Sequence, residues 1–242
     1  NAYNVAVGHN AGNDVTTGVH NTLIGGLAGD ALTDADYNVA VGYNSLGTSV
    51  LGSRSTAIGY QALLTENPAT ATDMYNTAVG FHSGLYITTG IQNTLIGALA
   101  GDALTDADYN QALGAYALSA DTKGNRSVAI GGSSLYTQNF TTSTNTFNTA
   151  VGHGTGYAIT TGIYNTLIGG NAGAALIDAD NNVALGVSAL VLDTYGSSSV
   201  AIGTSALATQ NFTTATDSYN TAVGHNAGTA VTTGVSNTLI GG

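Results

Sequence analysis

Charged residues are scarce in this sequence, and basic residues are almost absent. Only 7% of the 242 residues are charged, whereas soluble domains usually contain about 25%. Three basic residues stand against 14 acidic ones, which gives a net charge of −11. Binding to phosphate groups needs clustered lysine and arginine side chains, because those cations replace the counterions of the nucleic acid. The composition therefore argues against a nucleic-acid partner and against an anionic membrane surface.

The sequence also lacks the residues and motifs on which many enzyme families depend. It has no cysteine, and therefore no thiol nucleophile, and it has no H-E-x-x-H or G-x-S-x-G motif. The glycines in 152–156 are spaced as in a phosphate-binding loop, but no helix is expected after them. No run of about 18 apolar residues occurs, so no segment is expected to insert into a membrane. We expect a protein without catalytic activity, and no motif requires an organic cofactor.

A short glycine-punctuated repeat occupies the whole chain. The five-residue motif [NS]-[TVQ]-[AL]-[VIL]-G recurs fourteen times, beginning with 4–8, 21–25 and 38–42. Its closing glycines are separated by 17, 17, 17 and 21 residues, and this cycle repeats every 72 residues. Fixed periods of this kind indicate a repeat architecture. We expect one continuous array over 1–242, cut from a longer chain, with super-repeats at about 4–75, 76–147 and 148–219 and a partial one at 220–242.

Each repeat predicts one coil of a parallel β-solenoid. The β-branched residues before each glycine favour a short strand, the glycine permits a sharp bend, and no sustained helical period is present. Stacked coils pair at about 4.8 Å, so fourteen of them would form a rod roughly 65 Å long. The asparagines that open eleven coils are expected to form an amide ladder at a turn. The expected fold is all-β, a β-roll of about fourteen coils of 17 or 21 residues.

The two residues before each glycine give every strand two apolar faces. Successive side chains of a strand point to opposite sides. The residue before the glycine is always Val, Ile or Leu, and the one before that is always Ala or Leu. One face can fill the core of the coil, and the other needs to be covered. We expect the Ala/Leu row to be the covered face, because small side chains allow another surface to approach closely. Either one wide solenoid encloses both faces, or identical chains associate through alanines such as Ala40 and Ala57.

The motif resembles the repeats of a known family of adhesins. Segments 127–131 and 199–203, both S-V-A-I-G, resemble the head repeats of trimeric autotransporter adhesins (YadA-like β-rolls). The segments 76–80 and 93–97, N-T-A-V-G and N-T-L-I-G, are similar to repeats in fibres of bacteriophages and marine microbes. The adhesin resemblance implies a left-handed parallel β-roll, three chains side by side and binding to host or matrix surfaces. It carries over no catalytic residues, and the adhesin coils are typically shorter than those of this chain.

An aspartate-rich turn is the candidate site for a metal ion. Eight of the 14 acidic residues lie in this turn, and the pattern D-x-D-x-N occurs in it three times. Ca²⁺ prefers several oxygen ligands of this kind. The turn therefore either binds Ca²⁺ or forms a solvated acidic corner that keeps the rod in solution. The candidate ligands are Asp34, Asp36, Asn38, Asp106, Asp108, Asn110, Asp178, Asp180 and Asn182.

A four-residue insertion in the fourth coil of each unit is expected to be the most variable surface. It reads T-Q-N-F-T-T at 137–142 and at 209–214, but T-E-N-P-A-T at 65–70. Four extra residues must bulge from a regular coil. Phe140 and Phe212 therefore either make an exposed surface contact or form a lid on the core.

These patterns predict a structural function rather than chemistry on a substrate. We expect the shaft or head of an extracellular fibre or adhesin, which attaches to surfaces at a cell or virion exterior. Its partners would be identical chains, in a homotrimer or filament, and a host-cell surface or polysaccharide. A phage tail-fibre segment or a self-assembling extracellular filament is the alternative. An ice- or small-ligand-binding module is a different class, and the irregular alternation of threonine with valine before the core counts against it.

Overall fold

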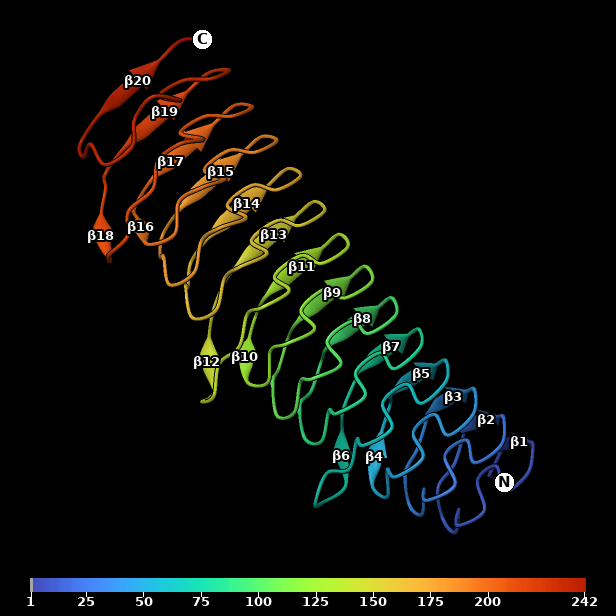
Figure 1. The fold of residues 1–242 in the computed structure, drawn as a ribbon. Coiled ribbons are helices and arrows are strands. Elements are labelled where there is room, and N and C mark those ends of the chain that lie inside the picture. The colour runs from blue at the N-terminus through green and yellow to red at the C-terminus, as the bar shows by residue number, and fades with distance from the viewer. Residues whose placement is uncertain (1) are drawn as a thin grey trace.

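The computed structural model describes residues 2–242, which form a rod of stacked coils (Figure 1). Each coil contributes one short strand to a parallel sheet of fourteen strands, in which coils adjacent in sequence are hydrogen-bonded neighbours. The expected all-β parallel β-solenoid of about fourteen coils is thereby confirmed. The strands of this sheet are β1 (Val5–Val7), β2 (Thr22–Ile24), β3 (Val39–Val41), β5 (Thr56–Ile58), β7 (Thr77–Val79), β8 (Thr94–Ile96), β9 (Gln111–Leu113), β11 (Val128–Ile130), β13 (Thr149–Val151), β14 (Thr166–Ile168), β15 (Val183–Leu185), β17 (Val200–Ile202), β19 (Thr221–Val223) and β20 (Thr238–Ile240).

Six strands of two residues form three further sheets at the insertions. Each sheet pairs one strand of the third coil of a unit with one strand of the fourth coil, and the inserted residues lead into the second strand. The loops of the fourth coils extend away from the large sheet in Figure 1. The pairs are β4 (Gly52–Ser53) with β6 (Thr72–Asp73), β10 (Gly124–Asn125) with β12 (Thr144–Asn145), and β16 (Gly196–Ser197) with β18 (Thr216–Asp217).

The glycine that closes each motif allows neighbouring coils to approach closely. Gly25 has a φ of 134°, and a Cβ added to it would lie 2.4 Å from the carbonyl oxygen of Gly42. Gly42 meets the carbonyl oxygen of Gly59 in the same way. Glycine alone adopts such a φ without steric cost. The invariant glycine therefore keeps the register constant along the sheet, where Ala40 pairs with Ala57.

The expected side-by-side contact through the alanine row is wrong, because that row faces the core. From β2 to β19 the middle residue of each strand is buried, and Ala40 and Ala57 have no exposed surface. The first and third residues of each strand point outward instead, so the solenoid does not enclose both faces. The interior is narrow because leucines of the opposite segment, such as Leu46 and Leu63, are also fully buried. In the coils that contain these leucines, the core has room for only a methyl group from the middle residue of the strand.

The large apolar side chain opposite the strand occupies one of two core positions, and which position it occupies follows a fixed order over four coils. In the first two coils of a unit, glycine stands four residues after the closing glycine and an apolar residue stands seven after it, as with Gly29 and Leu32. In the other two coils these positions hold leucine and a polar residue, as with Leu46 and Ser49. A Cβ added at Gly29 would lie 2.7 Å from Cδ1 of Leu32. Two large side chains do not fit together, so the 72-residue unit is a packing pattern as well as a sequence repeat.

The asparagines that open the coils form a ladder along one edge of the sheet, in which the amides bond mainly to backbone groups of the next coil rather than to one another. The side-chain oxygen of Asn38 accepts a hydrogen bond from the backbone N–H of Ser55 at 2.8 Å. Its side-chain nitrogen donates to the carbonyl oxygen of Gly52 at 2.9 Å. Asn21 makes the same bonds one coil earlier. Buried polar groups are nearly always paired in this way, and the ladder ties each coil to the next.

Candidate interaction surface

The outward face of the fourteen-stranded sheet is a continuous uncharged strip, which we name the outward strip. Its first row is formed by the first residue of each strand and contains eight Thr, five Val and one Gln. Its second row, formed by the third residue of each strand, contains only Val, Ile and Leu. None of these 28 side chains (two on each of fourteen strands) is charged, although the chain carries a net charge of −11. The second row consists of Val7, Ile24, Val41, Ile58, Val79, Ile96, Leu113, Ile130, Val151, Ile168, Leu185, Ile202, Val223 and Ile240.

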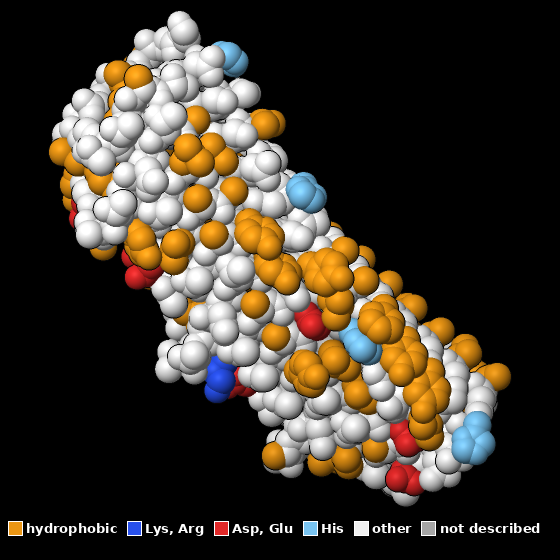
Figure 2. All heavy atoms as spheres, in the orientation of Figure 1, with side chains coloured by type: hydrophobic (Ala, Val, Ile, Leu, Met, Phe, Trp, Pro, Cys, Tyr) orange, Lys and Arg blue, Asp and Glu red, His pale blue; other side chains and the backbone are white. Residues whose placement is uncertain are grey.

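The second row of the outward strip presents large apolar side chains to the solvent. Ile24, Ile96 and Ile130 are 39%, 40% and 36% exposed. Figure 2 shows hydrophobic side chains over much of one face of the rod, with few acidic and basic side chains among them. Branching at Cβ stiffens the first side-chain torsion, so the strip offers a regular surface that loses little freedom on contact. Exposed apolar patches of several hundred Å² usually mark interaction sites.

One long edge of the outward strip carries a ladder of stacked rings. The ring centroids of Tyr3 and His20 are 5.4 Å apart, and those of His20 and Tyr37 are 4.9 Å apart. The guanidinium of Arg54 continues the ladder, at 4.9 Å from the ring of Tyr37 and 5.8 Å from that of Tyr75. Stacked aromatic pairs contribute about 0.5–1.5 kcal/mol beyond their buried area. The ladder therefore adds coil-to-coil stability while its outer edges stay exposed.

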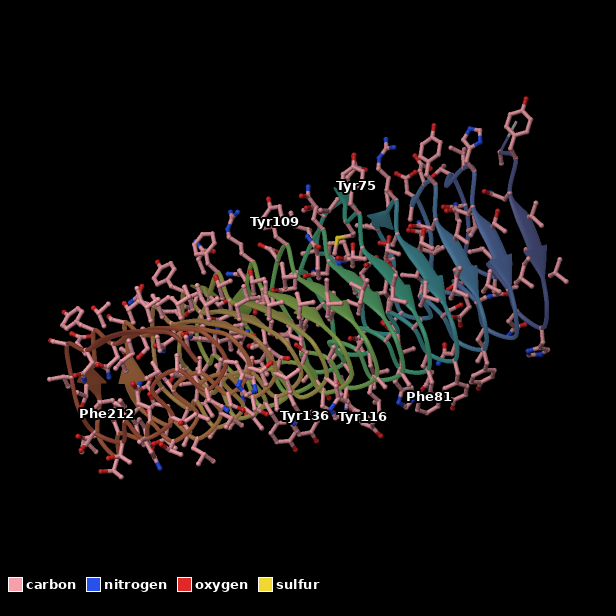
Figure 3. The ribbon with its side chains drawn as sticks, turned by 90° about the horizontal axis from the view of Figure 1, so that it is seen from above. Tyr75, Phe81, Tyr109, Tyr116, Tyr136 and Phe212 are labelled. Atoms are coloured by element: carbon pink, nitrogen blue, oxygen red, sulfur yellow. The ribbon has the colours of Figure 1, made fainter. Side chains whose placement is uncertain are left out.

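The opposite edge of the outward strip carries a second set of rings. Tyr43 stacks on Tyr60 at 5.6 Å, and Tyr60 stacks on Phe81 at 5.5 Å. Figure 3 shows Tyr75 and Tyr109 projecting from one side of the rod and Phe81 from the other side. In the first two units the outward strip is thus bordered by large amphipathic side chains on both sides.

The candidate Ca²⁺ ligands point to different partners. Asn38 lies fully buried in the asparagine ladder. Asp36 accepts a hydrogen bond from the backbone N–H of Val19 at 2.7 Å, and Asp34 accepts one from the hydroxyl of Thr17 at 2.6 Å. Over residues 2–242, no three His, Cys, Asp or Glu side chains are grouped so that they could hold a metal ion. The same placement recurs for Asn110, Asn182, Asp108, Asp178 and Asp180, while Asp106 lies 3.5 Å from the Lys123 ammonium.

The insertion folds back over the core instead of presenting its phenylalanine. Phe140 and Phe212 are only 7% and 6% exposed. A Cβ added at Gly124 would lie 3.0 Å from Cδ2 of Phe140, so the ring covers that glycine. The backbone N–H of Phe140 donates to the buried carboxylate of Asp121 at 3.1 Å, which holds the loop inward. Both phenylalanines are lids on the core, and neither is an exposed surface contact.

A buried acid–amide pair lies under each lid. The side-chain nitrogen of Gln138 donates to Asp121 at 2.6 Å, and Gln210 donates to Asp193 at the same distance. The backbone N–H of Gly124 also donates to Asp121, at 3.0 Å. Burial raises the pKa of the Asp121 carboxyl above its ordinary value, and these hydrogen bonds lower it in part. The pairs lie in the third and fourth coils of a unit, where leucine stands four residues after the closing glycine and a polar residue stands seven after it. In each pair the two buried polar side chains are hydrogen-bonded to one another.

In the first unit the acidic residue of the pair is in the fourth coil, instead of the third. Ser49 and Glu66 occupy the positions that Asp121 and Gln138 hold in the second unit, and Pro68, which has no N–H to donate, replaces the phenylalanine. The buried Glu66 carboxyl accepts hydrogen bonds from Ser55 and Asn76 at 2.9 Å. Burial raises the pKa of Glu66 to about 7. The hydroxyl of Ser49 is buried without a hydrogen-bond partner.

Comparison with known proteins gives no relative for this chain. No protein-family model matches it, no curated protein matches it, and no solved structure matches it. The β-solenoid architecture therefore rests on the geometry of the chain itself. Within residues 2–242 no helix is long and apolar enough to cross a membrane. The outward strip runs along all fourteen strands and remains exposed to solvent.

Proposed function

We propose that this chain is a segment of the shaft or head of an extracellular fibre or adhesin, which mediates attachment to surfaces and catalyses no reaction. It would act at a cell or virion exterior, as the likeness to adhesin heads and phage fibres suggests. Its partners would be identical chains, in a homotrimer or filament, together with a host-cell surface or polysaccharide. A phage tail fibre and a free extracellular filament would use the same segment in the same way.

The unbroken fourteen-stranded sheet is the observation that carries this proposal. Each strand pairs in constant register with the next over the whole array. Fourteen strands leave thirteen intervals of about 4.8 Å, so the sheet is about 62 Å long. Each coil from β2 to β19 contributes buried side chains to the core, and in solenoids stability adds along the stack. A rod of this kind suits a protein that must hold two points at a fixed distance.

An ice-binding module is a second candidate, because the first row of the outward strip faces away from the core, although threonine alternates irregularly with valine along it. Eight of the fourteen side chains in this row are threonine, and the others are five valines and Gln111. An outward, uncharged array of threonine and valine could order water along the rod. Partition of the protein into slowly grown ice, compared with albumin, would support this candidate, and equal exclusion of both proteins would remove it.

Attachment can be tested with beads that carry the chain. Beads coated with the protein should be retained under flow on at least one of a set of cell and polysaccharide surfaces, and albumin-coated beads should not. Electron micrographs of the same preparation should show straight rods. Retention no greater than that of albumin beads on every surface would refute attachment, and flexible or globular particles would refute the shaft.

A further inference from the structure

We infer that the outward strip is the contact surface for another copy of this chain. The inference deepens the proposed function and rests on it for its biological meaning, because a fibre is built from identical chains. Charge, periodicity and area each favour another copy of the chain over any other occupant of this exposed sheet face.

The outward strip is a side through which two copies can approach without bringing charged side chains together. Each copy carries a net charge of −11, and like-charged surfaces that face each other cost several kcal/mol. Aspartates such as Asp34 and Asp106 lie at the aspartate-rich turns, outside the strip. The 28 side chains of the strip, two on each of fourteen strands, carry no charge. Two copies that meet strip to strip therefore keep their acidic turns away from the contact.

Periodicity favours a partner with the same repeat. The strip repeats at every coil, with Val79 beside Ile96 and Ile130 beside Val151 in one register. A partner of irregular shape would match a few of these side chains and leave the rest exposed. Another copy presents the same spacing along its whole length, so that each apolar side chain can lie between side chains of the facing row. Symmetric self-complementary contacts are the commonest way in which soluble chains assemble.

The area of the strip is sufficient for a stable contact. The sheet is about 62 Å long, and a strand of three residues is about 10 Å wide, so the strip covers about 600 Å² on each chain. Two chains would then bury about 1,200 Å² in total, which reaches the lower bound of stable interfaces. The flanking rings, among them Tyr75 and Phe81, would enlarge the contact at its rim. Tyrosine and arginine are enriched at protein interfaces, and Arg54 lies in one of these edges.

The experiment compares the wild-type chain with two variants of equal added charge. Ile96→Glu with Ile130→Glu places two carboxylates in the second row of the strip. Thr141→Glu with Thr142→Glu places them on the exposed insertion loop, away from the strip. Light scattering over a dilution series measures the mass, and circular dichroism verifies the fold. The wild type and the loop variant should have at least twice the chain mass of 24.0 kDa. The strip variant should have the mass of one chain and an unchanged spectrum.

The milder pair Ile96→Thr and Ile130→Thr keeps the β-branched shape and guards against misfolding of the charged variant. It should assemble more weakly than the wild type at equal concentration. A wild type that remains a single chain, or a strip variant that assembles like the wild type, would overturn the inference. A single chain that partitions into ice would assign the strip to ordered water instead. The mass measurement uses no attachment surface. Assembly can therefore be observed while the coated beads are not retained, and the beads can be retained while the chain stays single, so each proposal can be refuted without the other.

Discussion

Replacing Glu66 with glutamine should stabilise the rod, and the gain should depend on pH. The carboxyl of Glu66 is fully buried, and no charged group contributes to its environment, so burial raises its pKa from 4.5 to about 7. A carboxyl whose pKa is higher in the folded state binds its proton more tightly there than in the unfolded chain. Stability from this group is therefore complete below about pH 4.5 and is lost as the pH rises through about 7.

The size of the effect follows from the shift. Each pKa unit corresponds to about 1.4 kcal/mol, so a shift from 4.5 to about 7 costs the folded state about 3–4 kcal/mol above neutral pH. Glutamine removes this cost. Its amide also has the donor that Gln138 uses, which bonds the Ser127 hydroxyl at 2.8 Å. In the first unit that donor would meet Ser55, and it would lie near the unpaired hydroxyl of Ser49.

The assay is denaturant unfolding of wild type and Glu66→Gln at about pH 4.5 and about pH 8, on either side of the shift. The variant should unfold at a higher denaturant concentration at the higher pH, and the difference should nearly vanish at the lower pH. Thr142→Ala, at an exposed position without a titratable group, is the control and should show no such dependence. A Glu66→Gln gain that is equal at both pH values, or a loss at about pH 8, would refute the account of this buried site.

Three further predictions concern the core and the aspartate-rich turns. Ala40→Glu should abolish folding, because it buries an unpaired charge in a full core, and circular dichroism of the variant beside Thr142→Glu would reveal it. Deletion of the 72 residues 81–152 should give a shorter rod with unchanged stability per coil. Deletion of the two coils 81–114 stacks one buried polar pair on another and should lower the melting temperature. Equal melting of both deletions would contradict the packing role of the unit. Added Ca²⁺ should leave the melting temperature unchanged relative to chelator at equal ionic strength, because Asn38 is committed to the ladder and Asp36 to a backbone N–H; a clear rise would restore the metal site.

The spacing of the glycines was sufficient to predict the fold. Every closing glycine lies where the backbones of two coils meet, as Gly25 and Gly42 do, so a regular spacing in sequence becomes a regular spacing in the rod. The asparagine ladder was also predictable, because an amide that recurs at one position in stacked coils meets the same backbone groups each time. Both features depend on local periodicity alone.

The inward and outward faces of the sheet could not be assigned from the motif alone. Small alanines suggested close approach of another chain, but the deciding information lies outside the motif, in Leu46 and its equivalents four residues after the glycine. Those leucines fill the coil from the opposite side and leave room for a methyl group at Ala40. The buried pair of Ser49 and Glu66 was missed for a related reason, although a signal exists. Between units, serine replaces aspartate, glutamate replaces glutamine and proline replaces phenylalanine together, as expected for residues in contact.

The most direct test of the account is thiol accessibility at two adjacent positions of β5. The chain contains no cysteine, so Ala57→Cys and Ile58→Cys each introduce a single thiol. In the background of Ile96→Glu and Ile130→Glu, where the strip should be uncovered, Cys at position 58 should react rapidly with a water-soluble maleimide. Cys at position 57 should react only on unfolding. Without the two glutamates, assembly should slow the reaction at position 58. Rapid reaction at position 57 and protection at 58 in the charged background would contradict both the assignment of the faces and the proposed contact between chains.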